Sequence, residues 1–255
     1  MDNEYLLNPF FLDSPAPLLS RLAGPAWSVN RPAIDESSQS ARIGAIHTPF
    51  AERVRAAAAA GHRPVTVGGD CLQTAAVLAG LRQAGIDPVV VWLDAHGDFN
   101  TPETSPSGFI GGMPLAMLVV RGDAWLRENV GLSAIAERDI ILSDARDLDP
   151  GEAANLSDSQ VSHVRTVAEI PNCVRPSRPV YVHFDTDIID VREAPSMMYP
   201  VAGGPSVSDL RWMAQTLHRT HTVVAVSMTA WDLGSDADGE TERACLSVLR
   251  ALVGG

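Results

Sequence analysis

The amino-acid sequence predicts an α/β fold, in which a mostly parallel sheet carries helices on both faces. Short runs of consecutive apolar residues, rich in Val and Ile, are typical of strands that are covered on both faces. Longer segments with apolar residues at three- and four-residue spacing stand between these runs and are typical of helices. Because the two kinds of segment alternate along the chain, we expect crossover connections and a parallel sheet.

The predicted strands share a Val- or Ile-rich core. "PVVVWLD" and "PVYVHFD" are clear examples, and each ends in an aspartate. In open parallel sheets, ligands bind just outside the carboxyl ends of the strands, so these ends are where we expect the chemistry. The strands are predicted at 64–69, 88–94, 139–145, 179–185 and 222–228.

Four segments are predicted to be helices. The first is rich in alanine, a strong helix former, and is expected to begin at His47. The second begins at Cys71 and ends at Gly85, a residue that commonly stops helices. In the third, Ser206 or Ser208 offers an N-cap. The helices are predicted at 47–62, 71–85, 206–220 and 239–255.

Length and composition favour one globular domain over 1–255, since 45% of the 255 residues are hydrophobic and 20% are charged. We find no run of about 18 apolar residues and no basic segment ahead of an apolar one, so a cytoplasmic location is expected. The formal net charge of −12 disfavours binding to nucleic acids and anionic membranes. The three cysteines are an odd number, which argues against a disulfide scaffold.

Potential metal ligands come at the ends of two predicted strands. Asp94, His96 and Asp98 follow one strand, and Asp185 and Asp187 follow another. Residues two apart in an extended backbone point the same way, so each set is expected to converge. A single aspartate here is more often a helix cap or ion-pair partner, but clustered carboxylates repel one another unless cations neutralise them. Carboxylates with an imidazole suit divalent ions, Mn²⁺ first and then Fe²⁺, Co²⁺ or Zn²⁺.

Two further residues near these strand ends have alternative interpretations. Cys71 follows the strand–helix junction "VTVGGD" and is either a small core residue or a ligand. Its position beside two ligand-bearing strand ends favours the ligand. His183 lies two residues before Asp185 on the same face of the strand. It is interpreted as a packed strand histidine, with a supporting position behind the ligands as the alternative.

Four motifs, in the right order, resemble those of the ureohydrolases, the arginase and agmatinase superfamily. They are "GGD" at 68–70, "WLDAHGDFNTPETSPSG" at 92–108, "FDTDIID" at 184–190 and "PVAGG" at 200–204. The resemblance implies an arginase-like three-layer α/β/α sandwich around a mostly parallel sheet. It also implies two divalent metal ions, Mn²⁺ in the first instance, a small guanidino substrate, and a homo-oligomer, commonly a trimer or hexamer.

By position, the resemblance also implies a set of metal ligands. Asp94 and Asp185 correspond to carboxylates that bridge the two ions. Asp98 would help to bind one ion together with Cys71, which stands where most members have histidine, so a divalent ion other than Mn²⁺ is an alternative there. The implied ligands are Cys71, Asp94, His96, Asp98, Asp185 and Asp187. Asp98 and His96 are also assigned catalytic roles.

The loop after the metal motif resembles the substrate-binding loop of arginases. Asn100 and Ser107 match residues that hold an α-carboxylate, and Asp149 and Glu152 match residues that hold an α-amino group. The resemblance therefore implies an α-amino acid substrate, either arginine or a close derivative.

Three positions depart from the arginase pattern. Cys71 replaces a histidine ligand, and Gly111 stands where arginases have a histidine thought to shuttle protons. Thr229 aligns with a glutamate that grips the guanidinium, so Thr229 is assigned to substrate binding. Ser227 and Asp232 are the other polar candidates at that place.

The first two departures also occur in amidinohydrolases that act on Nω-hydroxy-L-arginine. The loop "HGDFNTPETSPSGFIGGM" of this chain resembles the loop of those enzymes more closely than it resembles that of arginase. A hydroxylated guanidine has a lower pKa than guanidine, so its leaving group needs less acid catalysis. The resemblance thus implies cleavage of a guanidino C–N bond to urea or hydroxyurea and an amine. Two alternatives stay open: a catalytically degraded homologue that serves as a binding or scaffold subunit, and a metal hydrolase acting on a different C–N bond.

Overall fold

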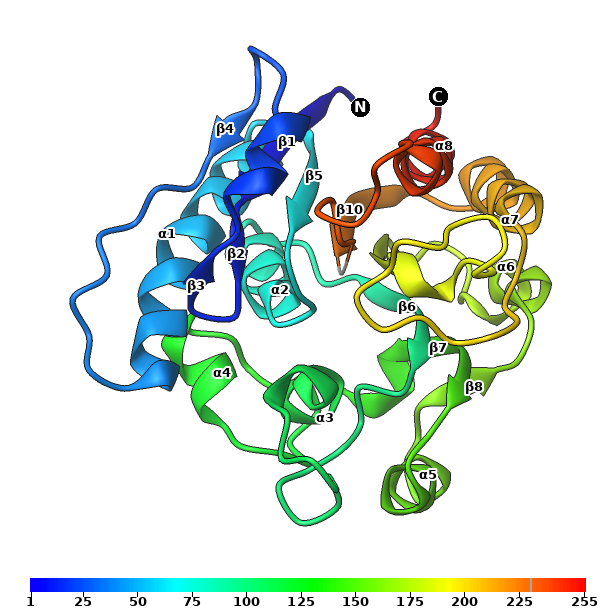
Figure 1. Cartoon of the computed structure of the whole chain (residues 1–255), viewed down its shortest axis with the longest axis horizontal. Coiled ribbons are helices and arrows are strands. Elements are labelled where there is room, and N and C mark those ends of the chain that lie inside the picture. The colour runs from blue at the N-terminus through cyan, green and yellow to red at the C-terminus, as the bar shows by residue number, and fades with distance from the viewer. Residues whose placement is uncertain (230) are drawn as a thin grey trace.

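A computed structural model describes residues 1–229 and 231–255 of the chain. Within those residues, one sheet has the strand order β4-β1-β5-β10-β9-β6-β7-β8, and its strands pair in parallel (Figure 1). Its strands are β1 (Asn3–Asn8), β4 (Ser28–Val29), β5 (Arg63–Gly68), β6 (Val89–His96), β7 (Ile140–Asp147), β8 (Ser162–Val164), β9 (Val180–Asp185) and β10 (Val223–Thr229). A separate antiparallel pair joins β2 (Phe10–Phe11) to β3 (Ser14–Pro15).

Helices cover both faces of this sheet. In Figure 1, the blue-to-green helices α1 to α4 lie on one side, and helices α6 to α8, yellowish green to red, lie on the other. The first group is α1 (Gln39–Ala59), α2 (Gln73–Gln83), α3 (Pro114–Leu118) and α4 (Trp125–Asn129). The second group is α6 (Ile170–Cys173), α7 (Val207–Thr220) and α8 (Glu240–Leu252), while α5 (Pro150–Ser157) follows β7. The predicted α/β class and the three-layer sandwich are therefore confirmed.

The central strands are buried on both faces, as their continuous apolar runs predicted. Val90 and Trp92 of β6 pack in the core beneath α1 and α2, whereas Val91 and Leu93 pack in the core beneath α7 and α8. Alternate residues of one strand thus belong to two different cores. This double burial holds the strand ends in place at the carboxyl edge of the sheet, where a binding site is expected.

All five predicted strands are confirmed within a few residues, and so are three of the four helices. The predicted start of the first helix at His47 is wrong, because α1 begins at Gln39, capped by Ser38. His47 lies within the helix and is only 2% exposed. Proline is usual in the first turn of a helix, but Pro49 sits well inside α1, so the local signal for the helix start was misleading.

Three strands of the sheet were not predicted, and each has a local reason. β1 has a polar residue at each end of a short apolar stretch, and β4 and β8 are only two and three residues long. The three cysteines are unpaired, as expected. Among the described residues, no helix combines the length and the apolar character needed to cross a membrane.

Candidate metal centre

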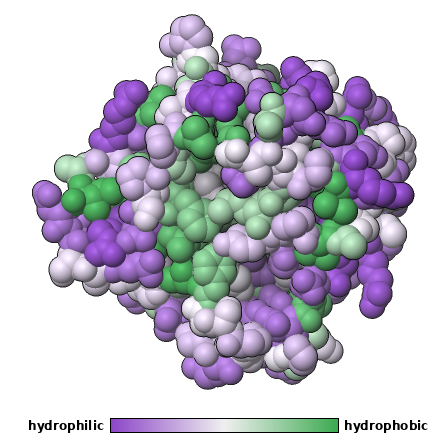
Figure 2. Space-filling model, in the orientation of Figure 1, coloured by the Kyte–Doolittle hydropathy of each residue, from purple (hydrophilic) through white to green (hydrophobic). Residues whose placement is uncertain are grey.

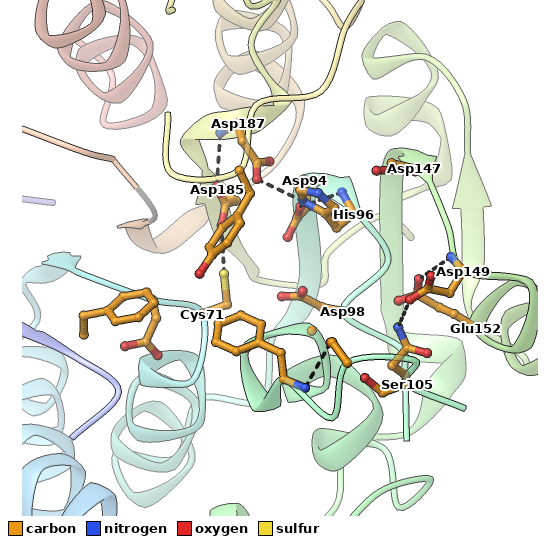
Figure 3. Close-up of a pocket in the computed structure, with 18 of the residues that line it drawn as sticks. Cys71, Asp94, His96, Asp98, Ser105, Asp147, Asp149, Glu152, Asp185 and Asp187 are labelled. Carbon is orange, nitrogen blue, oxygen red and sulfur yellow. Dashed lines mark hydrogen bonds and ion pairs between the residues drawn. The ribbon is translucent and has the colours of Figure 1, made fainter. Parts of the chain in front are cut away.

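A cavity of about 190 Å³ opens at the carboxyl ends of the central strands. Most of the residues that line it come from the ends of β5, β6 and β9 and from the segments that follow β6 and β7. On the face shown in Figure 2, hydrophilic residues predominate around the periphery, whereas hydrophobic and weakly polar residues surround the centre. Figure 3 shows Asp94, Asp98, Asp185 and Asp187 gathered near Cys71 and His96, with Asp149 and Glu152 farther to the right.

The turn after β5 brings Cys71 into this cavity. A side chain at Gly69 would place its Cβ 2.3 Å from the backbone oxygen of Phe10, so only glycine fits this close approach. The Asp70 carboxylate accepts hydrogen bonds from the backbone N–H groups of Leu12 (2.6 Å) and Leu72 (2.9 Å). Asp70 therefore ties the turn together, and the next residue, Cys71, faces the cavity.

Cys71 is buried and contacts a carboxylate from another strand. Its Sγ donates to Oδ2 of Asp185 across 2.9 Å, and the hydroxyl of Thr229 lies 3.5 Å from the same sulfur. Burial, and then the negative charges of Asp185 and Asp98, raise the pKa of the Cys71 thiol above its ordinary value. Without a cation the sulfur keeps its proton, and a divalent ion would be needed to remove it.

The end of β6 supplies Asp94 and His96. Asp94 accepts hydrogen bonds from the indole Nε1 of Trp92 (3.1 Å) and from the backbone N–H of His96 (2.7 Å). The strand ends at His96, and Asp98 has a left-handed φ of 50°. The expectation of an extended backbone from 94 to 98 is therefore wrong beyond His96. Asp98 still lines the cavity and is 4% exposed.

The end of β9 supplies Asp185 and Asp187 through the short 3₁₀ helix Thr186–Ile188. Asp185 accepts from the backbone N–H of Asp187 (3.1 Å) and so caps this turn. Asp187 Oδ1 accepts from the backbone N–H of Ala95 (3.1 Å), and its Oδ2 lies 3.0 Å from Nδ1 of His96. The ends of β6 and β9 are thus joined by the ligand-type side chains themselves.

Burial and mutual repulsion dominate the electrostatics of the cavity floor. Burial and the Asp187 charge raise the pKa of Asp94 to about 7. Burial, with the charges of neighbouring aspartates, raises the pKa values of Asp98 and Asp185 well above their usual range. Burial lowers the pKa of His96, but its contacts with Asp187 and Asp94 outweigh burial and raise it to about 12. The cluster therefore favours bound cations, whether protons or metal ions.

The donor atoms fit two divalent ions. One group joins Cys71, Asp94 and Asp185 with His183, and a second joins Asp94 with His96 and Asp187; in each group all ligand atoms lie within 4.8 Å of one another. Asp94 belongs to both groups, as a bridging ligand would. Oδ2 of the buried Asp98 has no hydrogen-bond partner within the described part of the chain, so this oxygen is available to a cation. The structure thus brings all six predicted ligands to one cavity, although Asp98 is in neither group.

The predicted substrate-binding residues of the loop lie on the opposite side of the cavity. Nδ2 of Asn100 donates to Oδ2 of Asp149 (2.9 Å), and Ser107 lines the same cavity. Glu152 has a different position in the network. Its two oxygens accept from the backbone N–H groups of Phe99 (2.8 Å) and Asp149 (3.2 Å), so both are already used to join the loop to α5.

Thr229 lies behind the cavity floor. It is 1% exposed, and its hydroxyl lies 3.5 Å from both Cys71 Sγ and Asp185 Oδ2. It is not among the residues that line the cavity, in which Gly111 does take part. Ser227 is fully buried below Thr229 on the same strand and does not line the cavity either.

Several cavity residues were not predicted from the sequence. Tyr199 is 42% exposed and packs against the rings of His96 and Phe109, with centroid distances of 6.5 and 5.6 Å. Phe11 comes from the β2–β3 pair, and Asp147 from the end of β7. Asp147 could have been found by the strand-end rule, since it ends a strand of the sheet. Tyr199 lies on an irregular segment and Phe11 on a two-residue strand, and neither carries a periodic signal.

Comparisons with known proteins point the same way. The sequence matches the arginase family over residues 31–254. An arginase from Neurospora crassa is 31% identical over 236 residues, which cover 80% of this chain and 64% of that protein. A non-hepatic arginase from Xenopus laevis is 30% identical over 208 residues, or 73% of this chain and 56% of that protein. The matched region thus spans less than two thirds of the length of these relatives.

Solved structures show the same fold. An arginase from Bacillus caldovelox superposes with a TM-score of 0.84 at 21% identity, covering 100% of this chain and 99% of that one. An arginase from Entamoeba histolytica, solved in complex with L-ornithine, also gives a TM-score of 0.84, at 20% identity and with the same coverage. These structures support the arginase-like architecture of the sheet and its helices.

Proposed function

The chain belongs to the arginase family, and from this premise we propose that it is a binuclear metal-dependent amidinohydrolase. It cleaves a guanidino C–N bond of an arginine-like substrate to urea or hydroxyurea plus an amine. Nω-hydroxy-L-arginine is favoured over arginine. The proposal rests above all on one observation: carboxylates from two strand ends, an imidazole and a thiol share one buried cavity floor.

The proposed ligands are the six residues that the resemblance implied. Asp94 and Asp185 would be shared between the ions, and Mn²⁺ is the first choice, with a softer divalent ion as the alternative beside Cys71. A pair of divalent ions supplies activation of water as a nucleophile at neutral pH. The remaining steps fall to residues of the chain.

Binding of the substrate is assigned to the side of the cavity opposite the metal ligands. Asn100 and Ser107 would hold the α-carboxylate, while Asp149 and Glu152 would hold the α-amino group. Asp149 is the better placed of the two acids, since both oxygens of Glu152 already accept backbone hydrogen bonds. Thr229 would act on the guanidine only indirectly, through Cys71 and Asp185.

The catalytic roles are assigned to Asp98 and His96, with proton transfer assigned to Asp98. The unpartnered Oδ2 of Asp98 would accept a proton from the attacking water and pass it to the nitrogen that leaves. The His96 ring, which lies 3.0 Å from Asp187, would help to hold an ion in place while the guanidine carbon becomes tetrahedral. Gly111 offers no side chain for proton transfer, and this favours the hydroxylated guanidine, whose pKa is lower than that of guanidine.

A second candidate function is a degraded homologue that binds a ligand without turnover. Thr229, aligned with a guanidinium-gripping glutamate, does not line the cavity, and this observation favours the alternative. Metal content separates the two candidates, because a degraded centre has no need of two ions.

The test is a substrate panel on protein loaded with Mn²⁺ and, in parallel, with Zn²⁺ or Co²⁺. Arginine, Nω-hydroxy-L-arginine and agmatine are incubated, and urea, hydroxyurea and amine products are measured beside metal content. We expect two ions per chain and the highest kcat/KM for Nω-hydroxy-L-arginine. Two ions without any product would overturn the substrate class, and one ion or none would favour the degraded homologue. We also propose that residues 1–255 form one domain, that the protein is cytoplasmic, and that it assembles as a trimer or hexamer. Light scattering tests the oligomeric state.

A further inference from the structure

A buried histidine outside the six predicted ligands belongs to the same cluster. His183 lies on β9, two residues before Asp185, and its side chain is fully buried. It pairs in register with Trp92 of β6 on one side and with Ser227 of β10 on the other. His183 therefore sits in the centre of the sheet, directly below the cavity floor.

Hydroxyl groups hold one nitrogen of this imidazole. Nδ1 lies 2.9 Å from Oγ of Ser227 and 3.1 Å from Oγ1 of Thr74, and the hydroxyl of Tyr181 lies 2.7 Å from Ser227 Oγ. The ring of Trp92 packs against the imidazole with a centroid distance of 4.0 Å. The position and orientation of the ring are thus fixed by contacts on several sides.

The other nitrogen has no such contact. Nε2 is buried and lacks a hydrogen-bond partner within residues 1–229 and 231–255. Leaving a buried polar atom unpaired costs on the order of 1–3 kcal/mol. A ring nitrogen of His183 also lies within 4.8 Å of the ligand atoms of Cys71, Asp94 and Asp185. The hydroxyl groups already engage Nδ1, so Nε2 is the nitrogen left without a partner, and it offers a lone pair when the ring proton is on Nδ1.

We propose that His183 is a metal ligand of this centre, and that its Nε2 completes a set with Cys71, Asp94 and Asp185. The inference rests on the proposed function, because it requires the metal centre. It accounts for the cysteine at position 71: the imidazole absent there is supplied instead by β9, which lies beyond β10 in the sheet. Metal-ligating histidines donate their other N–H to a fixed acceptor, and the hydroxyl groups of Ser227 and Thr74 are such acceptors.

The ligand set also determines which ion is preferred. A thiolate and an imidazole with two carboxylates suit Zn²⁺, Co²⁺ or Fe²⁺ better than Mn²⁺. The second group, Asp94 with His96 and Asp187, has no sulfur and is the harder of the two. We therefore infer an asymmetric pair of sites, with a borderline divalent ion on the Cys71 side.

The test uses the whole chain labelled with ¹⁵N-histidine and titrated with ¹¹³Cd²⁺. The chain has seven histidines, and a ring nitrogen bonded to cadmium shows a one-bond splitting. We expect two split histidines, His96 and His183, assigned by the loss of one signal in His183→Asn. Splitting of His96 alone would overturn this inference and leave the metal centre standing. Splitting of neither residue would overturn the metal centre itself.

Two variants separate ligation from packing. Ser227→Ala removes a hydroxyl partner of Nδ1 but leaves Nε2, so the His183 splitting should persist. His183→Asn should weaken zinc binding to the Cys71 side by at least about tenfold, the low end of the cost even for outer-shell partners. Unchanged zinc affinity in a folded His183→Asn protein would also count against the inference. If this variant does not fold, the spectrum of the labelled wild-type chain decides.

Discussion

The sulfur of Cys71 lies 2.9 Å from Oδ2 of Asp185, although 114 positions of sequence separate the two residues. This contact is a hydrogen bond, and in the proposed metal centre the two atoms would become neighbouring ligands. Cys71→Ala should therefore lose one of the two ions. Cys71→His keeps a ligand but replaces sulfur by nitrogen, so it should raise the affinity for Mn²⁺ relative to Zn²⁺.

Calorimetric titration of the apoprotein with each metal measures this effect. Cys245→Ala is the matched control, because Cys245 is also buried and unpaired but packs in the core around α7 and α8. It should leave both affinities unchanged. Equal metal affinities in Cys71→Ala and the wild type would show that Cys71 is a core residue rather than a ligand.

We expect substitutions to show that Asp149 binds substrate and that Glu152 stabilises the fold. Asp149→Asn keeps a good N-cap but loses the charge that would hold an α-amino group, so KM should rise with little change in Tm. Glu152→Ala removes both acceptors for the N–H groups of Phe99 and Asp149, so the free energy of unfolding should fall by about 1–3 kcal/mol. Steady-state kinetics and urea unfolding of both variants check the split. A raised KM with unchanged stability in Glu152→Ala would instead show that Glu152 binds substrate.

Gly111 and Gly112 offer a matched pair at the cavity wall. A Cβ at Gly111 would lie 2.3 Å from the Phe109 ring, whereas a Cβ at Gly112 meets nothing within 4 Å. Gly111→Ala should push Phe109 away from Tyr199 and raise KM by several-fold, while Gly112→Ala should leave it unchanged. Both proteins should unfold at nearly the wild-type temperature, since Phe109 lies at the cavity rather than in the core. Identical KM values for the two variants would mean that the aromatic wall does not contact substrate.

His47, which does not line the cavity, should make the stability of the protein depend on pH. Burial lowers its pKa from 6.5 to about 4 in the folded chain. Above pH 6.5 the residue is neutral in both states and has no effect. As the pH falls from 6.5 to 4, only the unfolded chain takes up the proton, so the folded state loses up to about 3 kcal/mol of relative stability.

Urea unfolding of the metal-free protein between pH 7 and pH 4 measures this loss. His47→Gln has no proton to gain, so its stability should fall less steeply than that of the wild type over this interval. The difference between the two curves isolates His47 from the carboxylates of the cavity. Parallel curves would show that His47 is protonated in the folded state as readily as in water.

The strand cores and strand ends were predictable because they depend on local pattern. Val-rich runs identify β6 and β9 by composition alone, and the two-residue spacing predicts that Asp185 and Asp187 act together. The start of α1 at Gln39 was not predicted from the alanine-rich segment, because a cap farther upstream, at Ser38, sets it. Short strands such as β4 form only because longer neighbours offer them an edge.

The site was predicted as a set of residues but not as a set of contacts. The turn at Asp98 depends on a left-handed backbone, which residue spacing does not reveal. The proximity of His183 to Cys71 depends on strands that are distant in sequence, so periodicity could place it only on the same face as Asp185. Packing of Phe109 against Tyr199 joins two irregular loops and left no pattern to detect.

The sheet order has a consequence for how the cavity comes into being. β10 lies between β5 and β9, although it is the last strand in the sequence. Before residues 223–229 are in place, β4-β1-β5 and β9-β6-β7-β8 have no shared edge, and Cys71 and Asp185 belong to two unconnected halves. An ion can therefore bind to Cys71 and Asp185 together only after β10 has been inserted between the two halves. Metal uptake should therefore be a late event during synthesis and refolding, and it reports that the sheet has closed.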